Sequence, residues 1–277
     1  MAKARSVAVP EDKEAEPLDA KDKYNVKIVE RSFEILDLAS RTETPLTVQL
    51  VCSELGLNPN MAFRLLATIS KAGYLEKDDK NGQYFISMKS LRLSRKALMS
   101  LEIRRVVLPC LELLWHQYPK ANLNMALYYQ GDIVVVDRID SINLPRTFSA
   151  PGRTLPFHCT GLGKVLTSEL PGSELDTLIS RQGLKAYTPA TITDAAALKA
   201  ELAKVRREGL ARDRAEFILN DNCNATAIRD SSQKIIAAIS ISAFESYMPV
   251  EEVEGTIDAL LSTARKISVF MGFSEYQ

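Results

Sequence analysis

Polar and cationic side chains recur at helical spacing between positions 60 and 71. Asn60, Arg64, Thr68 and Lys71 would share one face of a helix, because residues three and four apart are neighbours there. Amide and guanidinium groups pair with base edges in the major groove of DNA, and ammonium groups contact phosphates. We therefore expect Asn60, Phe63 and Arg64 to lie near bases, and Thr68 and Lys71 near phosphates.

The opposite face of this segment must hold it against a core. It carries an apolar stripe, and a shorter stripe precedes it. The stripes are Ala62, Leu65, Leu66 and Ile69, and before them Val48, Val51, Cys52 and Leu55. Gly56 separates the two stripes, Asn58 can cap the second helix, and Pro59 can occupy its first turn. Two helices joined by a tight turn are typical of a helix-turn-helix, whose second helix enters the major groove.

A charged hairpin is predicted after these helices. Gly73 ends the second helix, residues 74–77 and 83–87 are strand-like, and Asn81-Gly82 is typical of the turn between them. Lys77 and Lys80 on this wing would touch the DNA backbone or the minor groove. The predicted DNA-binding residues are Asn60, Met61, Phe63, Arg64, Thr68, Lys71, Lys77 and Lys80.

Charge is unevenly distributed in a chain whose formal net charge is zero. From Asn58 to Arg105 there are ten basic and four acidic residues, which leaves +6 (10 − 4). A basic segment in a neutral protein favours a double-stranded DNA partner, and a solvated helix face is the alternative.

Two serines suggest a second site. Ser240 and Ser242 lie two apart in a predicted strand, so their hydroxyls share a face that lines either a cavity or water. The segment Thr160-Gly161-Leu162-Gly163-Lys164 is expected to begin a helix, whose free N–H groups can bind an anion. A turn that needs glycine for conformation alone is equally compatible with this segment. A nucleotide-binding P-loop is rejected, because the earlier glycine is absent and no Ser or Thr follows the lysine.

Asp213 and Cys223 are ambiguous from sequence. Asp213 lies among Arg212, Arg214 and Glu216, which favours a surface ion-pair cluster. Cys223 lies in the run 220–224, whose asparagines suit a turn but also bring several donors together.

Composition excludes several classes of protein. The four cysteines are scattered without a CxxC spacing and are expected to be reduced thiols of a cytoplasmic protein. His116 and His158 are the two histidines, so neither a metal site nor another cofactor is expected. No apolar run reaches membrane-spanning length, and no membrane partner is expected.

The chain of 277 residues is long enough for about two domains. We expect a disordered tail over 1–23, a winged helix-turn-helix DNA-binding domain over 24–88, a linker helix over 89–106 and a second domain over 107–273. The first helix is expected to bury a stripe formed by Val26, Val29, Phe33 and Leu36.

Strands and helices alternate in the last domain. Strands are predicted over 123–129, 133–139, 210–214, 225–229 and 235–243. Helices are predicted over 161–169, 172–181, 195–208 and 250–271, and the helical stretch 89–117 is expected to be interrupted at Pro109. Hairpin-paired strands with segregated helices predict an α+β fold for the C-terminal domain, and a two-domain α+β chain as a whole.

In this order, the parts resemble the isocitrate lyase regulator (IclR) family of bacterial transcription factors over residues 24–273. The resemblance rests on the run 63–69 ending in Gly73-Tyr74, on the segment 155–164, and on 228–242, where 237–242 is especially close. It implies a dimer or tetramer on a palindromic operator. It also implies that residues 107–273 form a GAF-like α/β effector-binding and oligomerisation domain, whose small effector is often an organic acid.

Residue by residue, the resemblance places the effector pocket at Leu144, Gly161, Leu162, Asp213, Cys223, Ser240 and Ser242. The family usually has Ser-Thr at Asn60-Met61, a small residue at Leu162 and a glycine at Asn220. The expected function is thus a sequence-specific transcriptional regulator whose operator binding is modulated by a small molecule. The alternatives are a thiol-dependent enzyme on a small carboxylate, using Cys159 or Cys223 with an appended DNA-binding domain, and a structural nucleoid protein.

Overall fold

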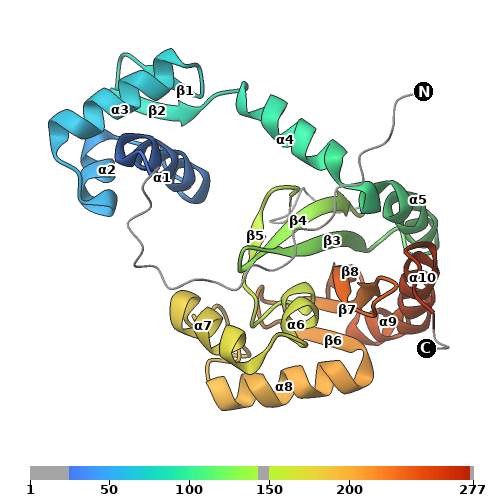
Figure 1. Cartoon of the computed structure of the whole chain (residues 1–277). Coiled ribbons are helices and arrows are strands. Elements are labelled where there is room, and N and C mark those ends of the chain that lie inside the picture. Colours follow the sequence, from blue (N-terminus) through green and yellow to red (C-terminus); the bar gives the residue numbers. More distant parts are fainter. Residues whose placement is uncertain (1–24, 143–149, 275–277) are drawn as a thin grey trace. The chain divides into compact units, whose positions relative to one another are not determined.

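The computed structural model describes residues 25–142 and 150–274 (Figure 1). The chain divides into two compact units, residues 1–93 and 94–277, and the division falls in the segment expected to link the domains. No helix among the described residues is long and apolar enough to cross a membrane.

The first unit is a helix-turn-helix followed by a hairpin. Its elements are α1 (Lys27–Arg41), α2 (Val48–Leu55), α3 (Pro59–Lys71), β1 (Leu75–Asp78) and β2 (Gln83–Ile86). Gly56 ends α2 at φ +63°, a left-handed conformation that glycine adopts without strain. The Asn58 side chain accepts the Met61 N–H at 2.9 Å, and Pro59 occupies the first turn, as predicted. The α3 residues predicted to face the core, Ala62, Leu65, Leu66 and Ile69, are buried.

The predicted inner stripe of the first helix is wrong. Ile35 and Leu38 are the buried residues of α1, while Val26, Val29 and Phe33 are exposed, Phe33 to 61%. Leu36 is only partly buried against the same core. α1 carries apolar residues on two faces, and sequence periodicity alone does not decide which face meets α2 and α3.

The helix that leaves the wing is interrupted earlier than predicted. α4 (Ser90–Ser100) and α5 (Glu102–Gln117) are separated by Leu101 in an extended conformation, and Pro109 lies inside α5. A proline inside a helix costs about 3 kcal/mol. The buried α5 residues Ile103, Val107, Leu111 and Leu114 offset this cost by packing on the sheet.

The second unit is a six-stranded antiparallel sheet in the order β5-β4-β3-β8-β7-β6. The strands are β3 (Asn122–Tyr129), β4 (Asp132–Ile139), β5 (Thr154–Leu155), β6 (Leu210–Arg214), β7 (Asp221–Arg229) and β8 (Ile235–Phe244). Antiparallel pairing confirms the α+β class.

Helices cover both faces of this sheet. α5, α9 (Val250–Glu254) and α10 (Ile257–Phe270) contribute to one apolar core. The opposite core contains residues of α6 (Gly161–Thr167), α7 (Gly172–Gln182) and α8 (Ala195–Glu208) (Figure 1). The predicted last helix is in fact two helices, α9 and α10, separated at Gly255 and Thr256.

Asparagines in the run 220–224 do not all serve a turn. β7 begins at Asp221, so Asn222 and Asn224 are strand residues. Asn220 alone among them has a positive φ, at 60°. Asparagine tolerates this left-handed conformation better than most residues, which explains why it can stand where the family usually has glycine.

α6 lies unusually close to the sheet and to the segment before it. A Cβ atom on Gly161 would lie 3.0 Å from the Ala225 Cβ and 3.1 Å from the Cys223 Sγ. A Cβ atom on Gly163 would lie 2.5 Å from the Phe157 carbonyl oxygen. Gly163 is therefore required for the close packing of α6, and a larger residue at Gly161 would require Ala225 or Cys223 to shift by a few tenths of an ångström.

Gly163→Ala is expected to destabilise the protein by about 1–3 kcal/mol, because its methyl group meets backbone atoms that cannot rotate away. Urea unfolding followed by circular dichroism measures this. Gly172→Ala is the matched control, since a Cβ there meets nothing within 4 Å. Equal stability of the two variants would show that α6 is not closely packed at Gly163.

Candidate functional site

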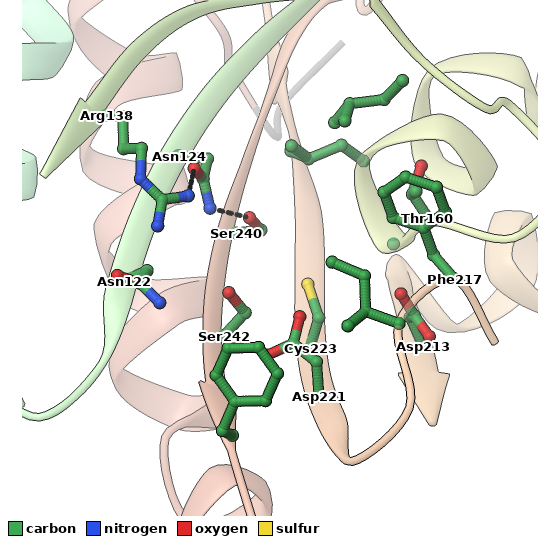
Figure 2. A pocket seen from close by; sticks show the side chains of 15 residues that line it. Asn122, Asn124, Arg138, Thr160, Asp213, Phe217, Asp221, Cys223, Ser240 and Ser242 are labelled. Carbon is green, nitrogen blue, oxygen red and sulfur yellow. Dashed lines mark hydrogen bonds between the residues drawn. The ribbon is translucent and has the colours of Figure 1, made fainter. Parts of the chain in front are cut away.

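Strand register assembles a row of polar side chains across the sheet. Asp213 pairs with Cys223, Cys223 with Ser242, and Ser242 with Asn122. Residues directly opposite each other on neighbouring strands project to the same face. The row therefore crosses β6, β7, β8 and β3 on one side of the sheet, the side toward α6 (Figure 2).

A second row runs beside the first. Ser240 pairs with Asn124 on β3, and Asn124 pairs with Arg138 on β4. The Asn124 amide donates to the Ser240 Oγ at 3.3 Å, and Arg138 Nη1 donates to the Asn124 Oδ1 at 2.9 Å. Both hydrogen bonds are visible in Figure 2. The Arg138 Nε also donates to Asp140 at 2.5 Å, so its guanidinium is held in place.

The start of α6 and the loop after β6 complete a pocket over these rows. The Thr160 side chain caps α6 by accepting the Gly163 N–H at 3.1 Å. The lining residues are Asn122, Asn124, Arg138, Leu155, Thr160, Gly161, Leu162, Asp213, Phe217, Ile218, Asp221, Cys223, Ser240, Ser242 and Phe244. Gly161 and Leu162 of α6 therefore line the same cavity as the two serines of β8.

The structure brings together six of the seven residues expected to form the effector pocket. Leu144 lies outside the described residues. Sequence reasoning missed Asn122, Asn124, Arg138 and Asp221. The two asparagines alternate with Leu123 and Met125 along β3, so alternation was the available signal there, whereas Arg138 directly follows Asp137 and shows no such alternation. Without the pairing partners, however, alternation does not tell which strands meet.

Asp213 is not part of the surface ion-pair cluster that its neighbours suggested. Its side chain is buried and accepts the Glu216 N–H at 2.8 Å, while Arg212 and Arg214 project to the other face and bind Glu254. Burial raises the pKa of Asp213 to about 8. Burial likewise raises the pKa of Asp221 to about 7, although the charge of Arg138 opposes this shift.

A buried ion pair fixes the loop that carries Phe217 and Ile218. The Lys164 Nζ lies 2.6 Å from Glu216 Oε1 and also donates to the Arg212 carbonyl. The Thr191 hydroxyl donates to the Glu216 carbonyl at 2.6 Å. Removing one partner of a buried pair leaves an uncompensated charge, so this loop is strongly anchored to α6.

The thiols are poorly placed for nucleophilic chemistry. Cys159 and Cys223 are buried, and burial raises the pKa of both thiols, which disfavours the reactive thiolate. The His158 Nε2 lies 3.0 Å from the Lys185 carbonyl oxygen and is engaged there. Among residues 25–142 and 150–274, no group of three His, Cys, Asp or Glu side chains is placed to hold a metal ion.

The predicted DNA-binding residues lie on the surface of the first unit. All eight, from Asn60 to Lys80, are exposed. Thr68 donates its hydroxyl to the Arg64 carbonyl at 2.7 Å, and Lys77 pairs with Asp79 at 2.9 Å. Exposed ion pairs of this kind contribute little to stability, so Lys77 can leave Asp79 and bind a phosphate instead. The predicted wing forms, with Leu75 opposite Ile86 and Asp78 opposite Gln83.

Comparison with known families gives two matches in the order of the two units. The family described as IclR helix-turn-helix domain matches residues 28–79, and the one described as bacterial transcriptional regulator IclR C-terminal matches residues 95–269. The chain belongs to the IclR family of bacterial transcriptional regulators. It therefore has a DNA-binding helix-turn-helix domain and a C-terminal domain of the type that binds effectors.

Two curated relatives match this chain over most of their own length. The chain is 27% identical to the HTH-type transcriptional regulator XynR of Escherichia coli, covering 90% of this chain and 98% of XynR. It is 26% identical to the transcriptional repressor IclR of the same organism, covering 89% of this chain and 90% of the repressor.

Solved structures share the fold. An IclR homologue from Microbacterium hydrocarbonoxydans, crystallised in complex with 4-hydroxybenzoate, is similar with a TM-score of 0.71 and 21% identity. The match covers 88% of this chain and 99% of that one. The Agobacterium tumefaciens repressor BlcR is similar with a TM-score of 0.57 and 27% identity, covering 91% and 99%.

Proposed function

We propose that this protein is a sequence-specific regulator whose operator binding is modulated by a small organic acid bound in the pocket of the second unit. The observation that carries the proposal is the pair of cross-strand rows, which gather hydroxyl, amide and guanidinium groups in one buried cavity. Such donors suit a carboxylate, and charge-assisted hydrogen bonds are stronger than neutral ones. An effector changes DNA binding only if it favours one arrangement of the protein over another.

DNA recognition is assigned to the exposed face of α3 and to the wing. Asn60, Met61, Phe63 and Arg64 are proposed to meet base edges, because they occupy the exposed first half of the helix. Thr68, Lys71, Lys77 and Lys80 are proposed to meet the phosphate backbone. Asn60 and Met61 differ from the usual Ser-Thr of the family, so the preferred bases are proposed to differ as well.

Arg64→Ala is expected to lower discrimination between the operator and random DNA by about 1–3 kcal/mol, the value of one good base contact. The fold should survive, because Arg64 is exposed. Gel-shift competition at fixed salt measures the preference. Arg206→Ala, a change at an exposed arginine on α8, is the control. An unchanged preference in Arg64→Ala would remove this residue from the base contacts.

The organic-acid class rests on the lining of the pocket. Ser240, Ser242, Asn122 and Asn124 supply neutral polar groups, and Arg138 supplies positive charge. The relative from Microbacterium hydrocarbonoxydans binds 4-hydroxybenzoate, an organic acid, in a chain of the same fold. A thermal-shift screen with lactate, gluconate, benzoate and 4-hydroxybenzoate samples short, sugar and aromatic acids, since a ligand of the folded state raises its apparent stability.

The double variant Ser240→Ala with Ser242→Ala is expected to weaken binding of the best acid at least tenfold, because each lost hydrogen bond to a charged group is worth about 1.5–3 kcal/mol. Operator affinity without the acid should stay the same. Calorimetry measures both affinities. Thr177→Ala with Ser180→Ala, two hydroxyls on the exposed face of α7, is the matched control. Wild-type affinity in the serine variant would place the acid elsewhere.

We prefer a transcriptional regulator to a thiol enzyme because Cys159 and Cys223 are both buried and kept protonated.

A bacterial protein that binds chromosomal DNA works in the cytoplasm, which we propose as the location of this protein. Leu162 occupies a position where the family usually has a small residue and lines the pocket. We therefore propose a compact or flat ligand.

We also propose that the protein binds DNA as a homodimer or a dimer of dimers. One recognition helix reads few base pairs, and paired half-sites about one helical turn apart supply the missing selectivity. The exposed apolar face of α1, formed by Ile28, Val29 and Phe33, is consistent with a protein interface. Light scattering at micromolar concentration, with and without operator, should give a dimer or tetramer mass. A monomer under both conditions would contradict the proposal.

A further inference from the structure

Two carboxylates share the proposed effector pocket, and among the described residues neither forms an ion pair. Asp213 is 5% exposed and accepts a single backbone N–H, from Glu216 at 2.8 Å. Asp221 is partly buried at the start of β7, two residues from Cys223 on the same face. In the part of the chain that the structure describes, no lysine or arginine lies within 4.0 Å of either carboxylate.

The groups around these carboxylates are mixed in charge. Lys164 of α6 is the cation that acts on Asp213, and it is already engaged by Glu216. Arg138 of β4 is the cation that acts on Asp221. The titratable and charged groups near enough to act on the two carboxylates are Arg138 (β4), Cys159 (before α6), Lys164 (α6), Glu216 (after β6), Cys223 (β7) and, from the opposite face of the sheet, Arg214 (β6).

The charge of the pocket lining conflicts with an anionic ligand. With both carboxylates ionised, the described residues of the lining carry −1, from Arg138 at +1 and Asp213 and Asp221 at −2 together. A buried carboxylate placed beside a bound carboxylate would be strongly disfavoured, because like charges at short range force one of them to take a proton. A protonated carboxyl, by contrast, gains an O–H donor for the ligand.

We propose that the pocket takes up a proton from solvent when it binds an anionic effector, and that the Asp213 and Asp221 carboxyls hold that proton. No covalent bond to the effector forms or breaks, and the protonated carboxyl donates a hydrogen bond to the effector carboxylate. This inference rests on the proposed function of the pocket as an organic-acid site. Its consequence is a regulator whose response to the acid weakens as the pH rises.

The two carboxyls are already close to the required state. Burial raises the pKa of Asp213 to about 8 and that of Asp221 to about 7, so each carboxyl gains or loses its proton in the range around neutral pH. A bound anion raises both values further, and binding then draws protons from solvent. The charge of Asp221 also raises the pKa of Asp213, so a proton taken up by either carboxyl affects the other.

The opposite arrangement makes the opposite prediction. If ionised Asp213 and Asp221 accepted hydrogen bonds from ligand hydroxyls, the ligand would favour their charged form. Binding would then release protons and would strengthen as the pH rises. The sign of the proton change separates the two arrangements.

Isothermal titration calorimetry at pH 7.5, in two buffers with different ionisation enthalpies, counts the protons exchanged. The probe is the tightest binder among lactate, gluconate, benzoate and 4-hydroxybenzoate. We expect net uptake of a fraction of a proton and an affinity about three- to tenfold weaker at pH 8.5 than at pH 6.5. Zero exchange or proton release in the wild-type protein would overturn the proposal.

Asparagine variants assign the proton to these residues. The double variant Asp213→Asn with Asp221→Asn imitates the neutral carboxyls, so we expect it to bind the acid without proton uptake and with equal affinity at both pH values. Asp176→Asn on α7, which removes an exposed acid paired with Lys199, is the control and should keep wild-type uptake. Unchanged uptake in the double variant would assign the proton elsewhere and overturn the proposal.

The two levels of the proposal fail differently. If an acid of the panel binds without proton uptake, the inference about Asp213 and Asp221 is wrong while the organic-acid site stands. If no acid of the panel raises the melting temperature or gives calorimetric heat, the organic-acid function itself is wrong, and the proton inference is wrong with it.

Discussion

The close approach of α6 to β7 is the constraint on which the second unit depends. Gly161 lies directly against Ala225 and Cys223 of β7, and Gly163 leaves no room for a side chain beside the Phe157 carbonyl oxygen. With the helix this close, the polar rows of the sheet are covered and kept from bulk water. The same contact orders the loop after β6, because Lys164 of α6 holds Glu216. The register of the sheet brings the polar side chains of the pocket together, and the close packing of α6 on β7 covers them.

The two units use polar groups in opposite ways. In the first unit, Asn60, Arg64 and their neighbours on α3 remain exposed, where charge is inexpensive and a polyanion can approach. In the second unit, Asp213 and Lys164 are buried, where an unpaired charge is costly. Binding of a charged ligand beside such groups changes their protonation. The first unit is thus suited to affinity for DNA, and the second to sensing a small charged molecule.

Much of this could be predicted from sequence. Local signals sufficed for the helix-turn-helix, since Asn58, Pro59 and Gly56 mark its ends, and for the hairpin, since Asn81-Gly82 marks its turn. Six pocket residues came from resemblance to a family, and Ser240 and Ser242 were also favoured by their spacing.

Non-local packing was not predictable from sequence. α1 has two apolar faces, either of which could pack on the core, and the direction of the Arg212 side chain became clear only from the register of β6. Asn122, Asn124, Arg138 and Asp221 were missed for the same reason, because their strands meet the serines only through pairing.

Reciprocal linkage between the acid and the operator is the most direct test of an effector-responsive regulator. Operator affinity is measured by fluorescence anisotropy across a range of acid concentrations, and acid affinity is measured by calorimetry with and without operator. Saturating acid should change operator affinity by a fixed factor, and operator should change acid affinity by the same factor, as linkage requires. Operator isotherms that superimpose at every concentration of an acid that demonstrably binds would contradict coupling between the pocket and DNA recognition.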